Sequence, residues 1–179
     1  MAAPDLFTLP HKALRAWLGA TATALGGLDT TNLDDRSTLV AQLRFLLTDL
    51  AEHGHHEDDF IVPVLDQHVP DLAERLRGEH IGLESAIATL GSIVAEFEQS
   101  PSPELQLSLY RELRGFEGRN LAHLDFEETV IMPALWQAVT ADDLIGVFQA
   151  FKAAHPDSVE LYHRVPNAIT PQERAMVFA

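Results

Sequence analysis

The stretch HGHHEDDFIVPVL, residues 53–65, places three histidines and three acidic residues in seven positions, directly before an apolar run with a proline. A second stretch, HLDFEETVIMPAL, residues 123–135, has the same histidine, glutamate and proline at the same internal spacing. An offset of 70 residues aligns His53 with His123, Glu57 with Glu127 and Pro63 with Pro133. One such pair could arise by chance, but two in register indicate a repeated site.

Both stretches continue an apolar stripe that has the spacing of a helix. Leucines recur in steps of three and four at Leu39, Leu43, Leu46 and Leu50, and the second stripe consists of Leu109, Leu113 and Phe116. Such spacing marks one buried face of a helix. The histidine and the glutamate of each stretch occupy later core-facing steps of these stripes. Because burying an imidazole or a carboxylate is costly unless the group is paired or coordinated, these residues need a partner inside the protein.

Helix-breaking clusters divide the chain into four long segments rich in Leu, Ala, Glu and Arg. The clusters lie at residues 26–32, around residues 69–70 and at residues 100–103. The sequence therefore predicts an all-α fold, an up-down-up-down four-helix bundle with a short fifth helix from about Ala141 to Ala154 and a C-terminal tail. We expect residues 1–140 to form the bundle and residues 141–179 to pack on it.

The first and third segments each add a histidine to the same end of this bundle. His11 lies near the start of the first segment and His80 in the early part of the third, and both belong to apolar stripes. In an up-down-up-down bundle, these positions lie level with the ends of the second and fourth segments. The predicted metal ligands are His11, His53, Glu57, His80, His123 and Glu127.

The spacing and the residue types favour a pair of metal ions. Side chains four residues apart lie one helical turn apart, with about 5–6 Å between Cβ atoms, so an imidazole and a carboxylate can reach one ion. A carboxylate can also bridge two ions. Four imidazoles and two carboxylates suit first-row metals, of which iron is the best candidate. Two ferrous ions, two carboxylates and one hydroxide leave a charge of about +1, which a protein interior tolerates.

On these residues the chain resembles the hemerythrin-like, HHE cation-binding family. The family pattern is present as PHKALR with His11, HGHHE with His53 and Glu57, EHIGL with His80, and HLDFE with His123 and Glu127. The resemblance covers about residues 8–140. It implies two non-haem iron ions with an oxo or hydroxo bridge, although another divalent metal is possible. It also implies a small oxidant ligand (O2, peroxide or NO) and a role in sensing, iron handling or the response to oxidative stress.

The chain departs from the oxygen carriers of that family in its third segment. Those carriers have a second histidine there, whereas this chain has Leu76 four residues before His80 and Glu84 four residues after it. Their last motif also ends in an aspartate, one residue further from its histidine than Glu127 is here. The seventh ligand is therefore missing, or it is replaced by Glu84 or by water. These departures argue against a simple reversible carrier and leave open whether the protein is an enzyme.

Several polar residues near the motifs are expected to be other than ligands. His55 and His56 are predicted to lie on the surface or beside the ligands. Asn120, one turn before His123, could hydrogen-bond a ligand or a bound oxygen species, or it could be a buried amide with partners of its own. The remaining histidines are predicted to lie on the surface: His68, His155 and His163.

Two other functions remain open on the sequence alone. A ferritin-like di-iron oxidase would carry Glu-x-x-His on two helices, but the only match here is Glu160 to His163 in the tail. A regulatory or interaction module is the other alternative, with a mononuclear or zinc-filled site.

Composition excludes several classes of partner and site. The formal net charge of −15 argues against nucleic acid and anionic membranes. The lack of cysteine excludes disulfides, thiolate zinc sites and iron–sulfur clusters. No apolar run approaches the ~20 residues of a membrane span, and the N-terminus has no secretory-signal pattern. We therefore expect a cytoplasmic protein, with a tail at residues 157–179 that packs over the bundle or mediates a homodimer.

Overall fold

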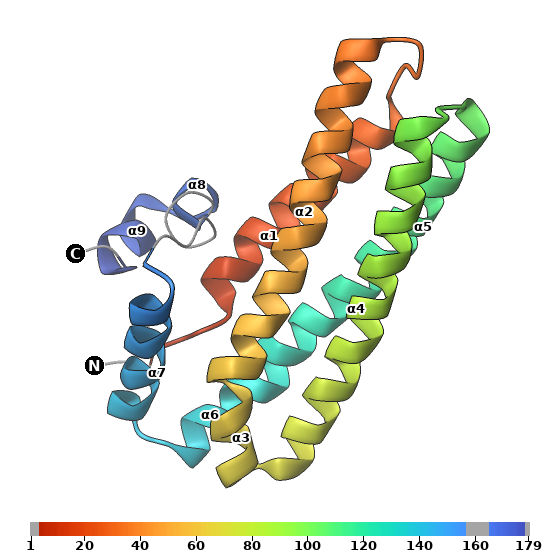
Figure 1. Cartoon of the computed structure of the whole chain (residues 1–179). Coiled ribbons are helices and arrows are strands. Elements are labelled where there is room, and N and C mark those ends of the chain that lie inside the picture. The colour runs from red at the N-terminus through yellow and green to blue at the C-terminus, as the bar shows by residue number, and fades with distance from the viewer. Residues whose placement is uncertain (1–3, 157–164, 178–179) are drawn as a thin grey trace.

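The computed structural model describes residues 4–156 and 165–177, and these residues form helices and no strand. This confirms the prediction of an all-helical fold. The long helices are α1 (Thr8–Gly26), α2 (Leu33–Phe60), α4 (Pro70–Gln99) and α5 (Pro103–Phe126) (Figure 1). The shorter elements are α3 (Val62–His68), the π-helical turn η1 (Glu127–Ile131), α6 (Met132–Ala138), α7 (Ala141–Ala154), α8 (Val165–Ala168) and α9 (Pro171–Val177).

Local sequence signals explain where the long helices begin. The Asn32 side chain accepts hydrogen bonds from the backbone N–H groups of Asp34 and Asp35 at the start of α2. The Ser102 side chain accepts one from Leu105 N at the start of α5. Both are typical N-caps, because they satisfy amide groups that lack a partner within the helix. Proline in the first turn of α4 and of α5 costs no internal hydrogen bond there.

The two repeated prolines lie at equivalent places, each in the first turn of a short helix. Pro63 lies in the first turn of α3, just after α2 ends, and Pro133 lies in the first turn of α6, just after η1. Proline has no N–H to donate, so it tends to stand where a helix is broken or restarted. In η1, the Met132 N–H donates to Glu127 O, five residues back. Such single π turns are often found at functional sites.

The four long helices enclose the interior. Helix α1 contacts α2 and α5, and helix α4 contacts the same two helices. The α1–α2 and α4–α5 connections lie at one end of the molecule, and α3 and α6 lie at the other (Figure 1). One apolar cluster includes Leu18, Leu46 and Phe116, and a second cluster includes Phe7 and Leu76. Along the sequence, the histidine of each long helix lies between residues that belong to, or pack against, the two different clusters.

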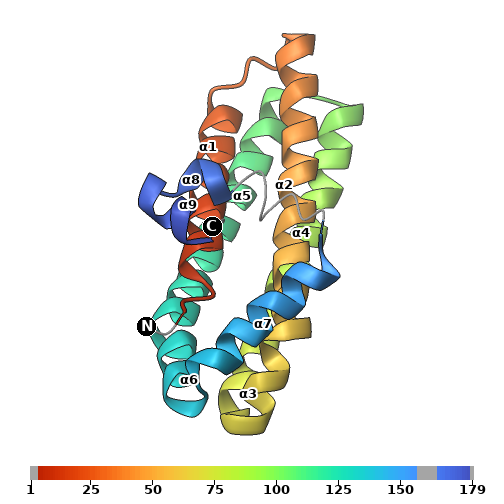
Figure 2. The same ribbon diagram turned by 90° about the vertical axis from the view of Figure 1, so that its left-hand side faces the viewer.

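The C-terminal helices pack on the outside of α1 and α2 (Figure 2). Helix α7 contacts α2 and occupies the range predicted for the fifth helix; it begins with a capping box formed by Thr140 and Asp143. Helix α8 contacts α1, where Val165 packs against Ala13. The part of the tail at residues 157–164 lies outside the described residues, and the division of the chain at residue 140 stays a prediction.

No single helix in the described part of the chain is long and apolar enough to cross a membrane. The bent pair formed by Pro103–Ala138 and Ala141–Ala154 passes the same test of length and composition, with a bend of 118° between its two parts.

Candidate metal centre

The structure brings all six predicted ligands together in one buried cluster. Their exposed fractions run from 0% for His11 and Glu127 to 7% for His53. Helices α1 and α4 each contribute one histidine, and α2 contributes a histidine and a glutamate. The remaining histidine and glutamate are His123, at the end of α5, and Glu127, in η1. The cluster separates the two apolar parts of the interior, as expected for side chains placed on core-facing stripes.

The cluster consists of two overlapping groups of four residues. The first contains His11, His53, Glu57 and Glu127, and the second contains Glu57, His80, His123 and Glu127. Within each group, one nitrogen or oxygen atom from every residue lies within 4.8 Å of the others. Each group is therefore compact enough to surround one cation, and the two glutamates belong to both.

Glu57 directs one carboxylate oxygen toward each pair of histidines. Its Oε1 lies 3.2 Å from His53 Nε2 and 3.7 Å from His11 Nε2. Its Oε2 lies 3.3 Å from His80 Nε2. A carboxylate that divides its oxygens in this way is placed to bridge two ions.

Glu127, the counterpart of Glu57 in the sequence repeat, has the same arrangement. Its Oε2 lies 3.4 Å from His11 Nε2, whereas its Oε1 lies 3.0 Å from His123 Nε2 and 3.6 Å from His80 Nε2. The two histidine pairs are therefore His11 with His53 and His80 with His123, and both glutamates lie between them.

Many of the facing atoms have no hydrogen-bond partner. Among the described residues, His11 Nε2, His80 Nε2 and both carboxylate oxygens of Glu57 and of Glu127 are buried without one. Leaving one buried polar atom unsatisfied is costly, and here several such atoms converge on a common centre. Imidazole nitrogen and carboxylate oxygen are ligands for divalent first-row metals, so the donor set fits metal cations.

The other ring nitrogen of three histidines faces a carboxylate outside the cluster. The distances from Nδ1 to the carboxylate oxygen are 2.9 Å for His11 and Glu128, 2.8 Å for His80 and Asp58, and 3.0 Å for His123 and Glu79. An ionised carboxylate only accepts hydrogen bonds, so Nδ1 must be the donor. When the ring is neutral, Nε2 therefore faces the centre with its lone pair available, which is the usual arrangement of histidine ligands to metals.

Two arginines hold these outer carboxylates in place. Arg15 Nη1 lies 2.5 Å from Glu128 Oε1, and Arg75 Nε donates to Glu79 Oε1 at 2.9 Å. The hydrogen bond from His11, followed by the one from Arg15, lowers the pKa of Glu128 to about 2. Glu128 is therefore ionised at neutral pH and able to orient the His11 ring.

Without metal, the cluster attracts protons. Burial lowers the pKa of His80, but the contacts with Glu127 and Glu57 outweigh it and raise the pKa to about 10. Burial raises the pKa of Glu57, and the surrounding histidines outweigh it and hold that pKa well below 4.5. The carboxylates of the centre thus favour protonated histidines beside them, and a bound cation would displace the protons of these histidines.

Glu84, considered as a seventh ligand, lies on the surface and outside both groups. Its carboxylate is 2.9 Å from His55 Nε2, and the two side chains are 48% and 61% exposed, respectively. Leu76, the other position considered, is fully buried in an apolar cluster. Of the expectations for the seventh ligand, its absence and its replacement by water therefore remain.

The other histidines differ in their surroundings. His55 and His68 are exposed, as expected. His56 and His155 are partly buried, and their ring centroids lie 4.3 Å apart where the end of α7 meets α2. The prediction of a surface position for His155 missed this contact, because it depends on how α7 packs. His163 lies outside the described residues.

The sequence analysis did not find the outer carboxylates or the π turn. Each carboxylate directly adjoins a predicted ligand in the sequence: Asp58 follows Glu57, Glu128 follows Glu127 and Glu79 precedes His80. Asp58 and Glu128 also correspond in the 70-residue repeat. This signal could have indicated them, whereas the π turn has no comparable sequence pattern.

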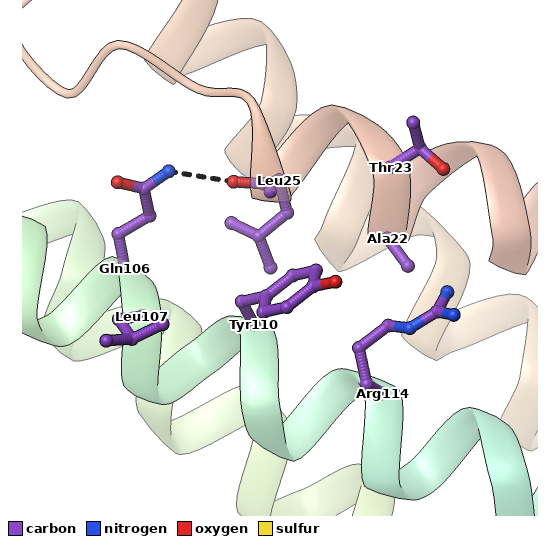
Figure 3. A pocket seen from close by; sticks show the side chains of 8 residues that line it. Ala22, Thr23, Leu25, Gln106, Leu107, Tyr110 and Arg114 are labelled. Atoms are coloured by element: carbon purple, nitrogen blue, oxygen red, sulfur yellow. Dashed lines mark hydrogen bonds between the residues drawn. The ribbon is translucent and has the colours of Figure 1, made fainter.

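A surface pocket lies between α1 and α5 (Figure 3). Its lining residues are Ala22, Thr23, Leu25, Gly26, Gln106, Leu107, Tyr110 and Arg114. Gln106 Nε2 donates to the backbone oxygens of Leu25, at 2.8 Å, and Leu28, at 3.0 Å. None of the six clustered residues lines this pocket.

Comparison with known families agrees with this geometry. The model of a family described as hemerythrin HHE cation binding domain matches residues 3–135, a range that includes all six clustered residues and ends before α7. No curated protein gives a significant match to the chain.

Proposed function

Because the chain belongs to the hemerythrin HHE cation-binding domain family, we propose that it is a non-haem di-iron protein that binds or reacts with O2, peroxide or NO. The observation that supports two ions rather than one is the sharing of Glu57 and Glu127 between two histidine pairs. A mononuclear site would need only one of these pairs, and it would leave the other pair buried without a ligand.

Each ion would have its own histidines. We propose that His11 and His53 hold one ion, that His80 and His123 hold the other, and that the two glutamates bridge them. Each ion would then be held by two histidine nitrogens and the two carboxylates. With an oxo or hydroxo bridge as well, the side chains would leave room for an external ligand at iron. Bound iron would supply the redox chemistry and the site of ligand binding.

The biological role that we propose is sensing, iron handling or a response to oxidative stress. Among the described residues no seventh side chain joins the cluster, and this supports the proposed role over simple oxygen carriage, because it leaves the centre more open to small molecules. The finer topology, an up-down-up-down four-helix bundle, is part of the same proposal. The contacts of α1 and α4 with both α2 and α5 support it.

The test of this function is an iron count on protein purified without oxygen. We expect two irons per chain for the wild type and none for the double variant His53→Ala/Glu57→Ala. The matched control is His55→Ala/Glu84→Ala, which removes an exposed pair of the same residue types, one of them on the same helix. The control should keep both irons. Equal iron in the wild type and in the His53→Ala/Glu57→Ala variant would contradict the proposal, as would purification with zinc alone.

Exposure of the iron-loaded protein to oxidants separates the possible roles. A long-lived oxygenated form after addition of O2 would favour carriage. Rapid irreversible oxidation would favour sensing, and gas evolution from peroxide would favour an enzyme. Optical spectra after each addition, with the His53→Ala/Glu57→Ala variant as the blank, give the readout.

A further inference from the structure

Asn120 is a buried amide that the proposed metal centre does not use. The residue is 4% exposed, and its Nδ2 has no hydrogen-bond partner among the described residues. It lies on α5 three residues before His123, so the two side chains share one face of the helix, with about 5–6 Å between Cβ atoms. An amide left unsatisfied in the interior costs stability, and such a residue needs an explanation.

The corresponding positions on the other three helices carry leucine. One turn inward from the clustered histidine, α1 has Leu14, α2 has Leu50 and α4 has Leu83, and all three belong to the apolar packing above the centre. Leucine at the fourth position would complete this apolar layer. Asn120 instead gives the inner side of the centre a neutral group that can donate two hydrogen bonds.

The other buried polar side chains are less suited to this role. Asp49, one turn before His53, is a carboxylate and would repel an anion. Glu117 has the same charge, and Arg114 Nη1 lies 2.5 Å from its Oε2. Thr21 lies ten residues beyond His11, almost three turns along α1. Of the buried polar residues outside the cluster that the structure describes, Asn120 is therefore the donor closest to the centre in helical position.

We propose that Asn120 donates a hydrogen bond through Nδ2 to a small anionic ligand bound at the metal centre. This inference rests on the proposed di-iron function. The ligand class is an anion of two or three atoms, such as peroxide or azide, in which one atom binds metal and another accepts the hydrogen bond. The buried Nδ2, which has no other partner among the described residues, is then explained as a donor whose acceptor is the ligand itself.

The test is an optical titration of the iron-loaded, oxidised protein with azide. In Asn120→Leu and Asn120→Ala we expect azide binding to weaken about 10- to 100-fold, because a hydrogen bond to a charged group is lost. Leucine could also block the ligand by its size, whereas alanine cannot, so both variants must show the loss. The control is Gln106→Leu, which changes an amide on the same helix far from the centre and should leave azide binding unchanged.

Thermal unfolding of the metal-free proteins gives a second readout that does not involve iron. Asn120→Leu should raise the midpoint, because it removes an unsatisfied amide and completes an apolar layer. Gln106→Leu should lower it, because that amide donates to the backbone oxygens of Leu25 and Leu28. A lowered midpoint for Asn120→Leu would show that the amide has a structural partner, and it would overturn the proposal.

The outcomes distinguish this inference from the function on which it rests. If the wild type binds two irons and azide, and both Asn120 variants bind azide within twofold of it, the role of Asn120 is wrong and the di-iron function stands. If the wild type binds neither iron nor azide, the di-iron function is overturned and this inference falls with it.

Discussion

Single histidines of the cluster depend on carboxylates that are not themselves part of it. Asp58, Glu79 and Glu128 each accept a hydrogen bond from the Nδ1 of one histidine, which fixes the ring so that Nε2 faces the centre. Such outer partners raise the basicity of a histidine ligand and restrict its orientation. Their contribution to metal affinity can be measured against controls, because exposed acidic residues that contact no clustered histidine lie close to them in the sequence.

Asp58→Asn should weaken metal binding by about 10- to 100-fold, because the amide is a poorer acceptor for His80 Nδ1. The measurement is the dissociation constant for Fe²⁺ from competition with a chelator. Asp59→Asn, an exposed neighbour of the same type, is the control and should bind as the wild type does. Equal affinities for the two variants would contradict a role for the outer carboxylate.

Metal affinity should rise with pH. Because the pKa of His80 without metal is raised to about 10, its imidazole holds a proton at neutral pH that the metal must displace. The stability of the metal-free protein should show the opposite trend and fall as the pH rises. The stability that protonated His80 contributes is fully present below the unfolded value of 6.5 and is lost as pH rises through about 10. Chelator competition and thermal unfolding between these two pH values test both signs, and an Fe²⁺ affinity independent of pH would contradict them.

The identity of the six clustered residues could be predicted from the sequence because each lies on an apolar stripe, where a buried polar group needs a partner. Asn120 stood out for the same reason. The outer carboxylates could not be selected in this way, since Asp58 and Glu128 lie on the flanks of their stripes, where acidic residues are common. Only the packing of neighbouring helices shows which of them faces a histidine.

At the scale of helices, the two halves of the repeat support each other. Asp58, at the end of α2, serves His80 on α4, and its counterpart Glu128, in η1, serves His11 on α1. The acid of each half thus orients the lone histidine of the other half. The repeated prolines lie just beyond these residues, in the first turns of α3 and α6.

The long helices and α7 could be predicted because their stripes, caps and breaks are local signals. The π turn could not, since no local sequence pattern marks it. The short helices α8 and α9 were also beyond prediction, because elements of this length are stabilised mainly by contacts with the rest of the protein. Here α8 depends on its contact with α1.

Helix α7 should loosen without loss of metal when its cap is removed. Thr140→Ala breaks the capping box with Asp143 and should lower the free energy of unfolding by about 1 kcal/mol. Denaturant unfolding measures the change, and the iron content should stay at the wild-type value because α7 contributes no clustered residue. The control is Thr89→Ala, the same substitution in the middle of α4, where the threonine caps no helix. Loss of iron in Thr140→Ala would show that α7 helps to form the centre.

For the whole molecule, the cluster makes metal part of the folding free energy. The buried donors cannot satisfy one another fully, so the metal-free protein has a cost in its interior that a bound cation removes. A ligand that binds only the folded state stabilises by about 2.7 kcal/mol at a hundredfold excess over its dissociation constant. Removal of metal with a chelator should therefore lower the thermal midpoint of the wild type and leave that of His53→Ala/Glu57→Ala unchanged. An unchanged wild-type midpoint would contradict a metal-stabilised fold.

Anomalous diffraction at the iron edge can show directly whether two metal ions share Glu57 and Glu127. Crystals of the iron-loaded protein should give two peaks within the bundle. One should lie beside His11 and His53, the other beside His80 and His123, and both should contact the two glutamates. A single peak, or two peaks with no carboxylate in common, would contradict the account.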